Sequence, residues 1–126
     1  MKLESVAKLG EDVLELELEI RDNVLDTTLL LREIFENRLK NSVSDLAYSA
    51  QSYLARGLAQ IAIEEARRRD VKTIGFSGGV ASNRQMTLII AEAIKSEGLT
   101  FVSNENVPPG DGGTSFGQAV VAGFGD

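Results

Sequence analysis

The sequence predicts an α/β fold in a single domain that covers residues 1–126. Two observations carry this prediction. Apolar residues recur with period two in some segments and at spacings of three and four in others, in the order strand, helix, helix, strand, helix, strand, helix. One apolar strand also runs into a glycine turn and then into a helix, which is typical of a parallel crossover. We therefore expect a small mixed sheet packed with about four helices, and three strands are so few that a partner is expected to complete it.

The first half of the chain contains one predicted strand and two predicted helices. Over residues 14–21, leucine and isoleucine alternate with charged residues, which indicates a strand with one buried and one charged face. Asp26 has the side chain of an N-cap for a helix that ends near residue 40, and a longer helix is expected over residues 43–69. Gly57 lies inside that helix and indicates close approach to another backbone. The apolar stripe of the longer helix consists of Leu46, Ala47, Ala50, Leu54, Leu58, Ile61 and Ala62.

The second half of the chain predicts two strand-to-helix units. A strand is expected over residues 71–76 and a helix over residues 84–96, with Gly98 at the position that usually ends a helix. A short strand over residues 99–102 and a last helix over residues 114–122 follow.

The composition limits the class of protein. With 43% hydrophobic and 25% charged residues, the chain is typical of a soluble globular domain. It has no apolar run of the roughly 20 residues that span a bilayer, no signal-peptide core and no cysteine, so we expect a cytoplasmic location. A net charge of −6 argues against independent binding of nucleic acid. The three arginines at residues 67–69 lie where cations complement a helix dipole.

Histidine is absent from the sequence, and its absence limits the chemistry. No histidine of this chain can act as a general base or a metal ligand. Any catalysis must use carboxylates, hydroxyls, backbone donors or a cofactor, or residues from another chain.

A glycine turn at Ser77-Gly78-Gly79 joins the second predicted strand to the next helix. It can be a tight turn whose glycines only let strand and helix pack closely. It also matches five of the six positions of the Ser-Gly-Gly-x-Asp-Ser loop of N-type ATP-dependent ligases, with Ala81 in place of the aspartate. The helix that follows points its first free N–H groups toward the turn, which suits an anion or a nucleotide.

A third interpretation rests on three motifs in one order. The chain has Ser-Gly-Gly-Val-Ala-Ser-Asn at residues 77–83, Pro-Pro-Gly-Asp-Gly-Gly at 108–113 and Gly-Gln-Ala at 117–119. With these motifs, the stretch from Asp45 to Gly123 resembles the C-terminal end of the HypF-type carbamoyltransferases, which mature the iron centre of nickel–iron hydrogenases. The resemblance implies a ribonuclease H-like lobe of the actin-like and sugar-kinase-like ATPases. The related tRNA threonylcarbamoyl transferases share the glycine turn but follow it with a Thr-Asp-Asn-type loop, so the carbamoyl branch fits better.

The resemblance also implies roles for individual residues. ATP or a related nucleotide would lie with its adenine and ribose along Ser77, Gly78, Gly79 and Asn83. Asp111 would be a ligand of a divalent metal beside the phosphates, and the N–H groups of Gly112 and Gly113 would meet phosphate oxygens. Read without the family, Asp111 is also a good turn residue and a cap for the next helix.

Enzymes of this class work in a cleft between two lobes, and the metal site of the family uses histidines from the segment before this one. We therefore expect this chain to be one lobe, and to be inactive until another chain supplies the N-terminal lobe. The full reaction would activate carbamoyl phosphate with ATP to a carbamoyl-adenylate. The alternative is a non-catalytic interaction module with the same fold. In both cases we expect a homo-oligomer that associates through the helix stripe of residues 47–61.

Overall fold

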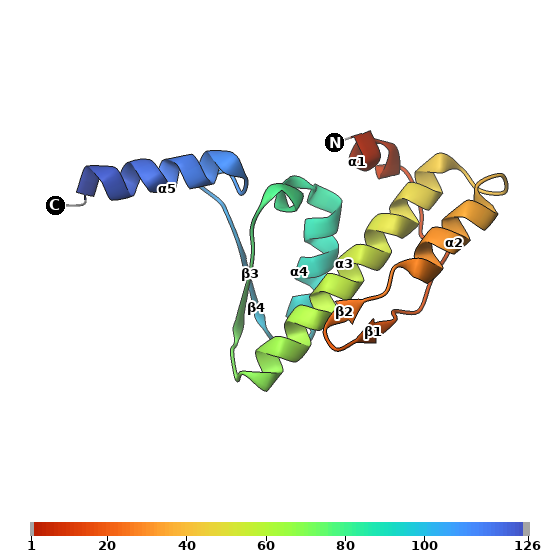
Figure 1. Ribbon diagram of the computed structural model, residues 1–126, viewed down its shortest axis with the longest axis horizontal. Helices are drawn as coiled ribbons and strands as arrows, with labels where there is room; N and C mark the ends of the chain where they lie inside the picture. Colours follow the sequence, from red (N-terminus) through yellow and green to blue (C-terminus); the bar gives the residue numbers. More distant parts are fainter. Residues whose placement is uncertain (1, 125–126) are drawn as a thin grey trace.

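The computed structural model describes residues 2–124 and confirms the α/β fold class. Its elements are α1 (Lys2–Ala7), β1 (Ile20–Arg21), β2 (Val24–Leu25), α2 (Thr28–Asn37), α3 (Val43–Arg68), β3 (Thr73–Phe76), the 3-10 turn η1 (Gly79–Ser82), α4 (Arg84–Ser96), β4 (Thr100–Ser103) and α5 (Asp111–Phe124). Helices α1 to α4 and the strands form the body of the molecule. Helix α5 extends away from this body, beyond the ends of β3 and β4 (Figure 1).

The strands form two separate pairs and not one mixed sheet. Strands β3 and β4 pair in parallel, as the crossover pattern predicts, with Thr73 opposite Thr100. Strands β1 and β2 form an antiparallel hairpin that the sequence prediction missed. Its turn consists of Asp22 and Asn23, with φ of 51° and 62°. Aspartate and asparagine tolerate this left-handed conformation, which matches the twist of a hairpin.

The sequence predicts a strand over residues 14–21. The predicted alternation of buried and exposed side chains is correct, but most of the segment does not pair with another strand. Half-buried and exposed residues do alternate along the segment. Only Ile20–Arg21 pairs with another strand. Earlier in the segment, the N–H groups of Val13 and Leu14 donate to the Ser49 hydroxyl of α3, at 3.0 and 3.3 Å. The segment therefore lies along α3 and bonds to its side chains instead of to a sheet.

Helix α3 is the central element, and it packs against α4 on one side and α1 on another. A buried cluster between α3 and α4 forms the core, and the inner face of β3 and β4 packs against it; its members are Ala55, Ala59, Ile63, Met86, Ile90 and Ile94. The predicted stripe of α3 is only partly correct, because Leu58 is 46% exposed. Polar residues occupy part of the buried face instead, among them Ser49 and Gln51. Gly57 does mark a close approach, but to the side chain of Leu25 and not to another backbone.

Helix α2 is shorter than the sequence predicts. It begins at Thr28 and ends at Asn37, and its N-cap residue is Thr27. The carboxylate of Asp26 still accepts a hydrogen bond from the Thr28 N–H at 2.8 Å. Asp26 therefore stabilises the start of the helix from one position earlier than an N-cap.

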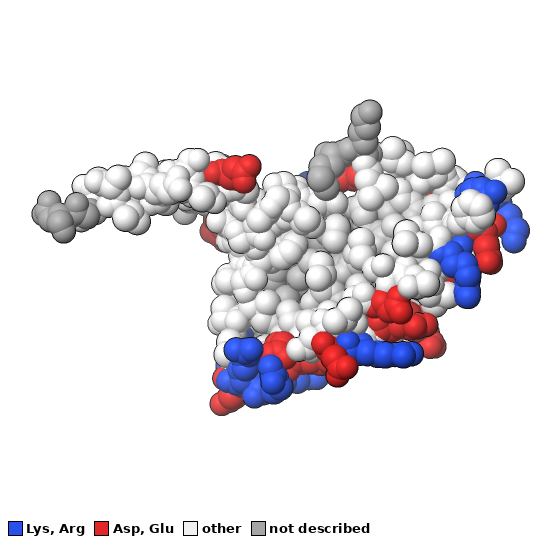
Figure 2. Space-filling view, in the orientation of Figure 1, with Lys and Arg blue, Asp and Glu red and all other residues white. Residues whose placement is uncertain are grey.

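Charged side chains gather along one edge of the molecule, over the C-terminal end of α3 and over α2 (Figure 2). The arginine cluster of residues 67–69 lies at this edge, and its charges are paired. Arg68 and Arg69 donate to Glu65, and Arg67 donates to Glu97. Hydrogen bonds led by that from Arg68 lower the pKa of Glu65 to about 2. Among the described helices, none combines the length and the apolar character needed to cross a membrane.

Candidate functional site

The two glycine motifs meet at one end of the β3–β4 pair. Because the strands are parallel, the residues after Phe76 and those after Ser103 leave the sheet at the same edge. The Gly78 N–H donates to the Pro109 carbonyl oxygen at 2.6 Å. The Ser77 hydroxyl donates to the same oxygen at 3.3 Å. The structure therefore joins the two motifs through one main-chain hydrogen bond and one from the Ser77 side chain.

Two hollows lie beside this junction, and Ser77 borders both. One, of about 270 Å³, lies between the glycine turn and the proline loop, with Asn104, Val107, Pro108 and Thr114 among its walls. The other, of about 360 Å³, lies over the ends of β3 and β4. Ligands of open α/β sheets bind outside the carboxyl ends of the strands, so this edge is the candidate site.

The predicted site glycines have different structural roles. Gly78 has φ of 102° and ψ of 178°, a conformation that only glycine adopts readily. A Cβ atom on Gly113 would overlap the carbonyl oxygen of Pro108. By contrast, a Cβ on Gly79 would meet no atom within 4 Å, and one on Gly112 would make ordinary contact with the Pro108 ring at 3.5 Å. The fold requires Gly78 and Gly113, whereas Gly79 is exposed and the fold would tolerate a side chain there.

Asn83 is buried, with 2% of its surface exposed, and its side chain is used within the protein. Its Oδ1 accepts hydrogen bonds from the N–H groups of Gln85 and Met86, at 3.1 and 3.2 Å, and so caps α4. Its Nδ2 donates to Gln51 Oε1 at 2.8 Å. The structure thus gives Asn83 the role of positioning the turn, and its contact with a ribose stays a prediction.

The expectation of free N–H groups at the start of α4 is wrong. Besides the two groups that Asn83 caps, the Arg84 N–H donates to Glu4 Oε1 of α1 at 3.0 Å. Glu4 is far from this helix in the sequence, so local pattern could not reveal the bond. Its carboxylate already complements the positive end of the α4 dipole. The start of α4 is therefore not an open anion site.

Asp111 begins α5, which starts three residues earlier than predicted. Gly112 and Gly113 are therefore in the first turn of a helix, where the Gly113 N–H donates to the Gly110 carbonyl at 2.9 Å. An aspartate at this position stabilises a helix through its dipole. Within residues 2–124, no group of three or more acidic, histidine or cysteine side chains could hold a metal. Asp111 is a single carboxylate, so the described residues alone do not fit a divalent metal.

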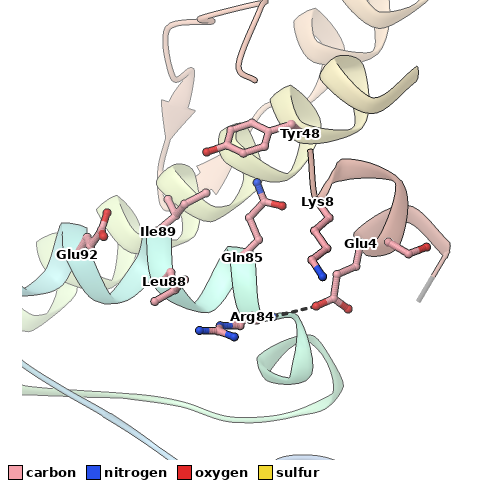
Figure 3. A pocket seen from close by; sticks show the side chains of 9 residues that line it. Glu4, Lys8, Tyr48, Arg84, Gln85, Leu88, Ile89 and Glu92 are labelled. Carbon is pink, nitrogen blue, oxygen red and sulfur yellow. Dashed lines mark hydrogen bonds between the residues drawn. The ribbon is translucent and has the colours of Figure 1, made fainter. Parts of the chain in front are cut away.

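A larger hollow, of about 580 Å³, lies between α1, α3 and α4. Figure 3 shows Gln85 pointing from α4 toward Tyr48 of α3, while Glu4 of α1 and Lys8, the residue after α1, lie near the start of α4. The sequence prediction missed this hollow because it placed no helix over residues 2–7. A six-residue helix carries too little periodicity to be recognised.

Comparisons with known proteins agree with this geometry. The family model described as "Carbamoyltransferase, Kae1-like Domain, second subdomain" matches residues 1–118. The chain is 38% identical to the probable carbamoyltransferase HypF of Methanocaldococcus jannaschii over 122 residues. The matched residues make up 96% of this chain and 16% of that relative.

Solved structures show the same relationship. HypF from T. kodakarensis superposes with a TM-score of 0.84 at 36% identity, over 98% of this chain and 16% of that one. A full-length HypF in its phosphate- and nucleotide-bound form gives a TM-score of 0.79 at 29% identity, over 96% of this chain and 16% of the other. The chain thus spans about one sixth of the length of these relatives.

Proposed function

Because this chain belongs to the HypF-type carbamoyltransferase family, as the second subdomain of the Kae1-like domain, we propose that it is the nucleotide-binding half of an ATP-dependent carbamoyltransferase. Its fold is one lobe of the actin-like type. The reaction that this half would serve begins when water cleaves carbamoyl phosphate to carbamate and phosphate. The carbamate then displaces pyrophosphate from ATP to give a carbamoyl-adenylate, and AMP leaves when the carbamoyl group passes to its acceptor. Hydrogenase maturation in the cytoplasm is the process that we assign to it.

The observation that carries this proposal is the meeting of the two motifs at the carboxyl ends of β3 and β4, where Ser77 borders two hollows and Gly79 lies exposed nearby in the chain. The turn η1 begins at Gly79, and the opening N–H groups of a 3-10 turn have no partner within it. They are main-chain donors suited to a ribose or phosphate oxygen, and the first of them belongs to Gly79, which has no side chain. This half would therefore act by positioning the nucleotide. No step through a metal is assigned, because Asp111 stands without further ligands among the described residues.

Alanine at Gly79 tests the nucleotide site directly. We expect Gly79→Ala to keep the melting temperature, since its Cβ meets nothing within 4 Å, and to weaken ATP binding at least about tenfold because the methyl group occupies the ligand's space. Gly78→Ala is expected to lower stability by about 1–3 kcal/mol through backbone strain. Calorimetric titration with ATP and a non-hydrolysable analogue, beside thermal unfolding, measures both effects.

The control for this experiment is Gly117→Ala on α5, whose Cβ also meets nothing within 4 Å. It should bind ATP as the unmodified chain does. If Gly79→Ala binds ATP with unchanged affinity, the nucleotide does not lie over the turn. If no variant and no unmodified chain binds ATP even with the first subdomain present, the non-catalytic interaction module becomes the better description.

We further propose that the partner is the first subdomain and that α5 docks against it. None of the described residues of α5 is buried, and Phe116, Val121 and Phe124 are 55%, 72% and 87% exposed. Apart from Asp111 at its start, α5 shows no charged atoms in Figure 2. Large apolar side chains exposed together on a helix with so little charge are typical of a surface that another element covers. In the α3 stripe expected to form a homodimer, Ala47 is buried within the chain and Leu58 is 46% exposed, so association through that stripe stays a prediction.

Serine at Phe124 tests this interface. We expect Phe124→Ser to weaken binding to a separately produced first subdomain at least about tenfold, because a large exposed aromatic is the type of residue that anchors an interface. Phe35→Ser on α2, where the ring is 63% exposed, is the matched control and should bind normally. Surface plasmon resonance measures the two affinities. Equal binding by both variants would show that α5 does not form the interface.

A further inference from the structure

A buried chain of hydrogen bonds connects α1 to the glycine turn through Gln51 of α3. Gln51 is 1% exposed. Its Nε2 donates to the Leu3 carbonyl oxygen of α1 at 3.1 Å, and its Oε1 accepts from Asn83 Nδ2 at 2.8 Å. Asn83 in turn caps α4. One glutamine side chain therefore connects the two elements that flank α3.

A second bond from α1 reaches the same place. Glu4 Oε1 accepts from the Arg84 N–H at 3.0 Å, drawn as the dashed line in Figure 3. The first N–H groups of α4 are thus held either by α1 directly or by an asparagine that Gln51 orients. We call the set of Leu3, Glu4, Gln51 and Asn83 the α1 clamp.

The two amide side chains of the α1 clamp, Gln51 and Asn83, are buried, so losing their hydrogen bond is costly. A buried amide that loses its partner pays the full desolvation of its polar atoms, and linked amides reinforce one another. Asn83 cannot keep both its cap on α4 and its bond to Gln51 if Gln51 moves with α1. A displacement of α1 therefore weakens the hydrogen bonds that hold residues 79–86, where η1 leads into α4.

We propose that Gln51 is a positioning residue that holds the glycine turn in place, so that the nucleotide affinity of the turn depends on the position of α1. The second part rests on the proposed function. Through the α1 clamp, anything that shifts α1 by a fraction of a hydrogen-bond length loosens the start of α4 and the turn before it. The clamp thus makes α1 a regulatory element of the site.

Two variants separate the bonds of the clamp. Gln51→Met keeps the length of the side chain and removes both of its hydrogen bonds, whereas Glu4→Ala removes the carboxylate that holds the Arg84 N–H. Gln60→Met is the matched control, because Gln60 lies on the exposed face of the same helix. Amide hydrogen exchange measured by NMR gives a local readout for each variant, with the Ile90 amide in the middle of α4 as the reference.

In Gln51→Met we expect the amides of Gln85 and Met86 to exchange about tenfold faster relative to Ile90, since a lost cap costs about 1 kcal/mol or more. In Glu4→Ala we expect the same change at Arg84, and Gln60→Met should match the unmodified chain. A merely structural glutamine would instead raise exchange evenly along α4. If the Gln85 and Met86 amides of Gln51→Met exchange as slowly as in the unmodified chain, Gln51 does not position the start of α4.

Titration of the same variants with ATP tests the regulatory part. We expect both clamp variants to bind ATP several-fold more weakly, with Gln60→Met unaffected. If Gln51→Met binds ATP as tightly as the unmodified chain although its Gln85 and Met86 amides exchange faster, the position of α1 does not control the nucleotide affinity. If the unmodified chain binds no ATP even with the first subdomain present, the proposed function fails, and the exchange pattern alone decides whether Gln51 positions the turn.

Discussion

Replacement of Asn83 by alanine is expected to lower the free energy of unfolding by about 2–4 kcal/mol. The variant loses the acceptor that caps the N–H groups of Gln85 and Met86. It also leaves Gln51 Oε1 without its partner in a buried position. Urea unfolding followed by circular dichroism measures the change as a shift in the midpoint at constant slope.

Asn83→Asp is the informative companion variant. Its carboxylate can still cap α4, but it cannot donate to Gln51 and sets a buried charge against Gln51 Oε1, so we expect it to be no more stable than the alanine variant at neutral pH. Asn106→Ala changes an exposed asparagine and should have almost no effect. Normal stability of Asn83→Ala combined with lost ATP binding would instead show that the side chain serves the ligand and not the fold.

Replacement of Gly10 by alanine is expected to have a similarly large effect, a loss of about 2–3 kcal/mol. A Cβ atom at this position would overlap the main-chain carbonyl of Ser44 in the first turn of α3. Because that carbonyl belongs to a helix, it cannot move aside cheaply. The segment that carries α1 would have to lift from α3, and with it Ala7, which is completely buried.

Thermal unfolding and exchange of the α1 amides measure this effect. Gly123→Ala is the control, since its Cβ meets no atom within 4 Å and a helix gains from alanine. Gly10→Ala with full stability would mean that the contact between residue 10 and α3 is not needed for the fold. In that case α1 would dock through its other contacts alone.

The sequence predicts the second half of the fold well because its signals are local. The elements β3, α4 and β4 form one crossover unit in which the glycine turn, Asn83 and Gly98 all act on their immediate neighbours. The first half depends on contacts over long separations. The segment before β1 satisfies its N–H groups with Ser49, 36 residues from Val13, and no periodicity reveals such a partner.

The candidate site shows the same division. Its two motifs and their approximate positions follow from the sequence, and the structure brings Ser77 and Pro109 together. The sequence alone could not tell the glycines apart, because Gly79 and Gly113 have identical side chains and opposite surroundings. It also could not show that Asn83 is buried, since that depends on Gln51, 32 residues earlier. Whether a nucleotide contacts these residues stays a prediction.

The joint between the two motifs has a genetic consequence. The hydrogen bond from Gly78 to Pro109 uses only main-chain atoms, so it carries no preference for the chemistry of either side chain. In a saturation mutagenesis screen, we therefore expect the bond to restrict only positions 78 and 113. Position 78 should reject residues that cannot adopt the backbone conformation of Gly78, and position 113 should reject residues with a Cβ atom. Neighbouring positions can then diverge freely between lineages while the joint persists, and compensating pairs of substitutions across it are not expected.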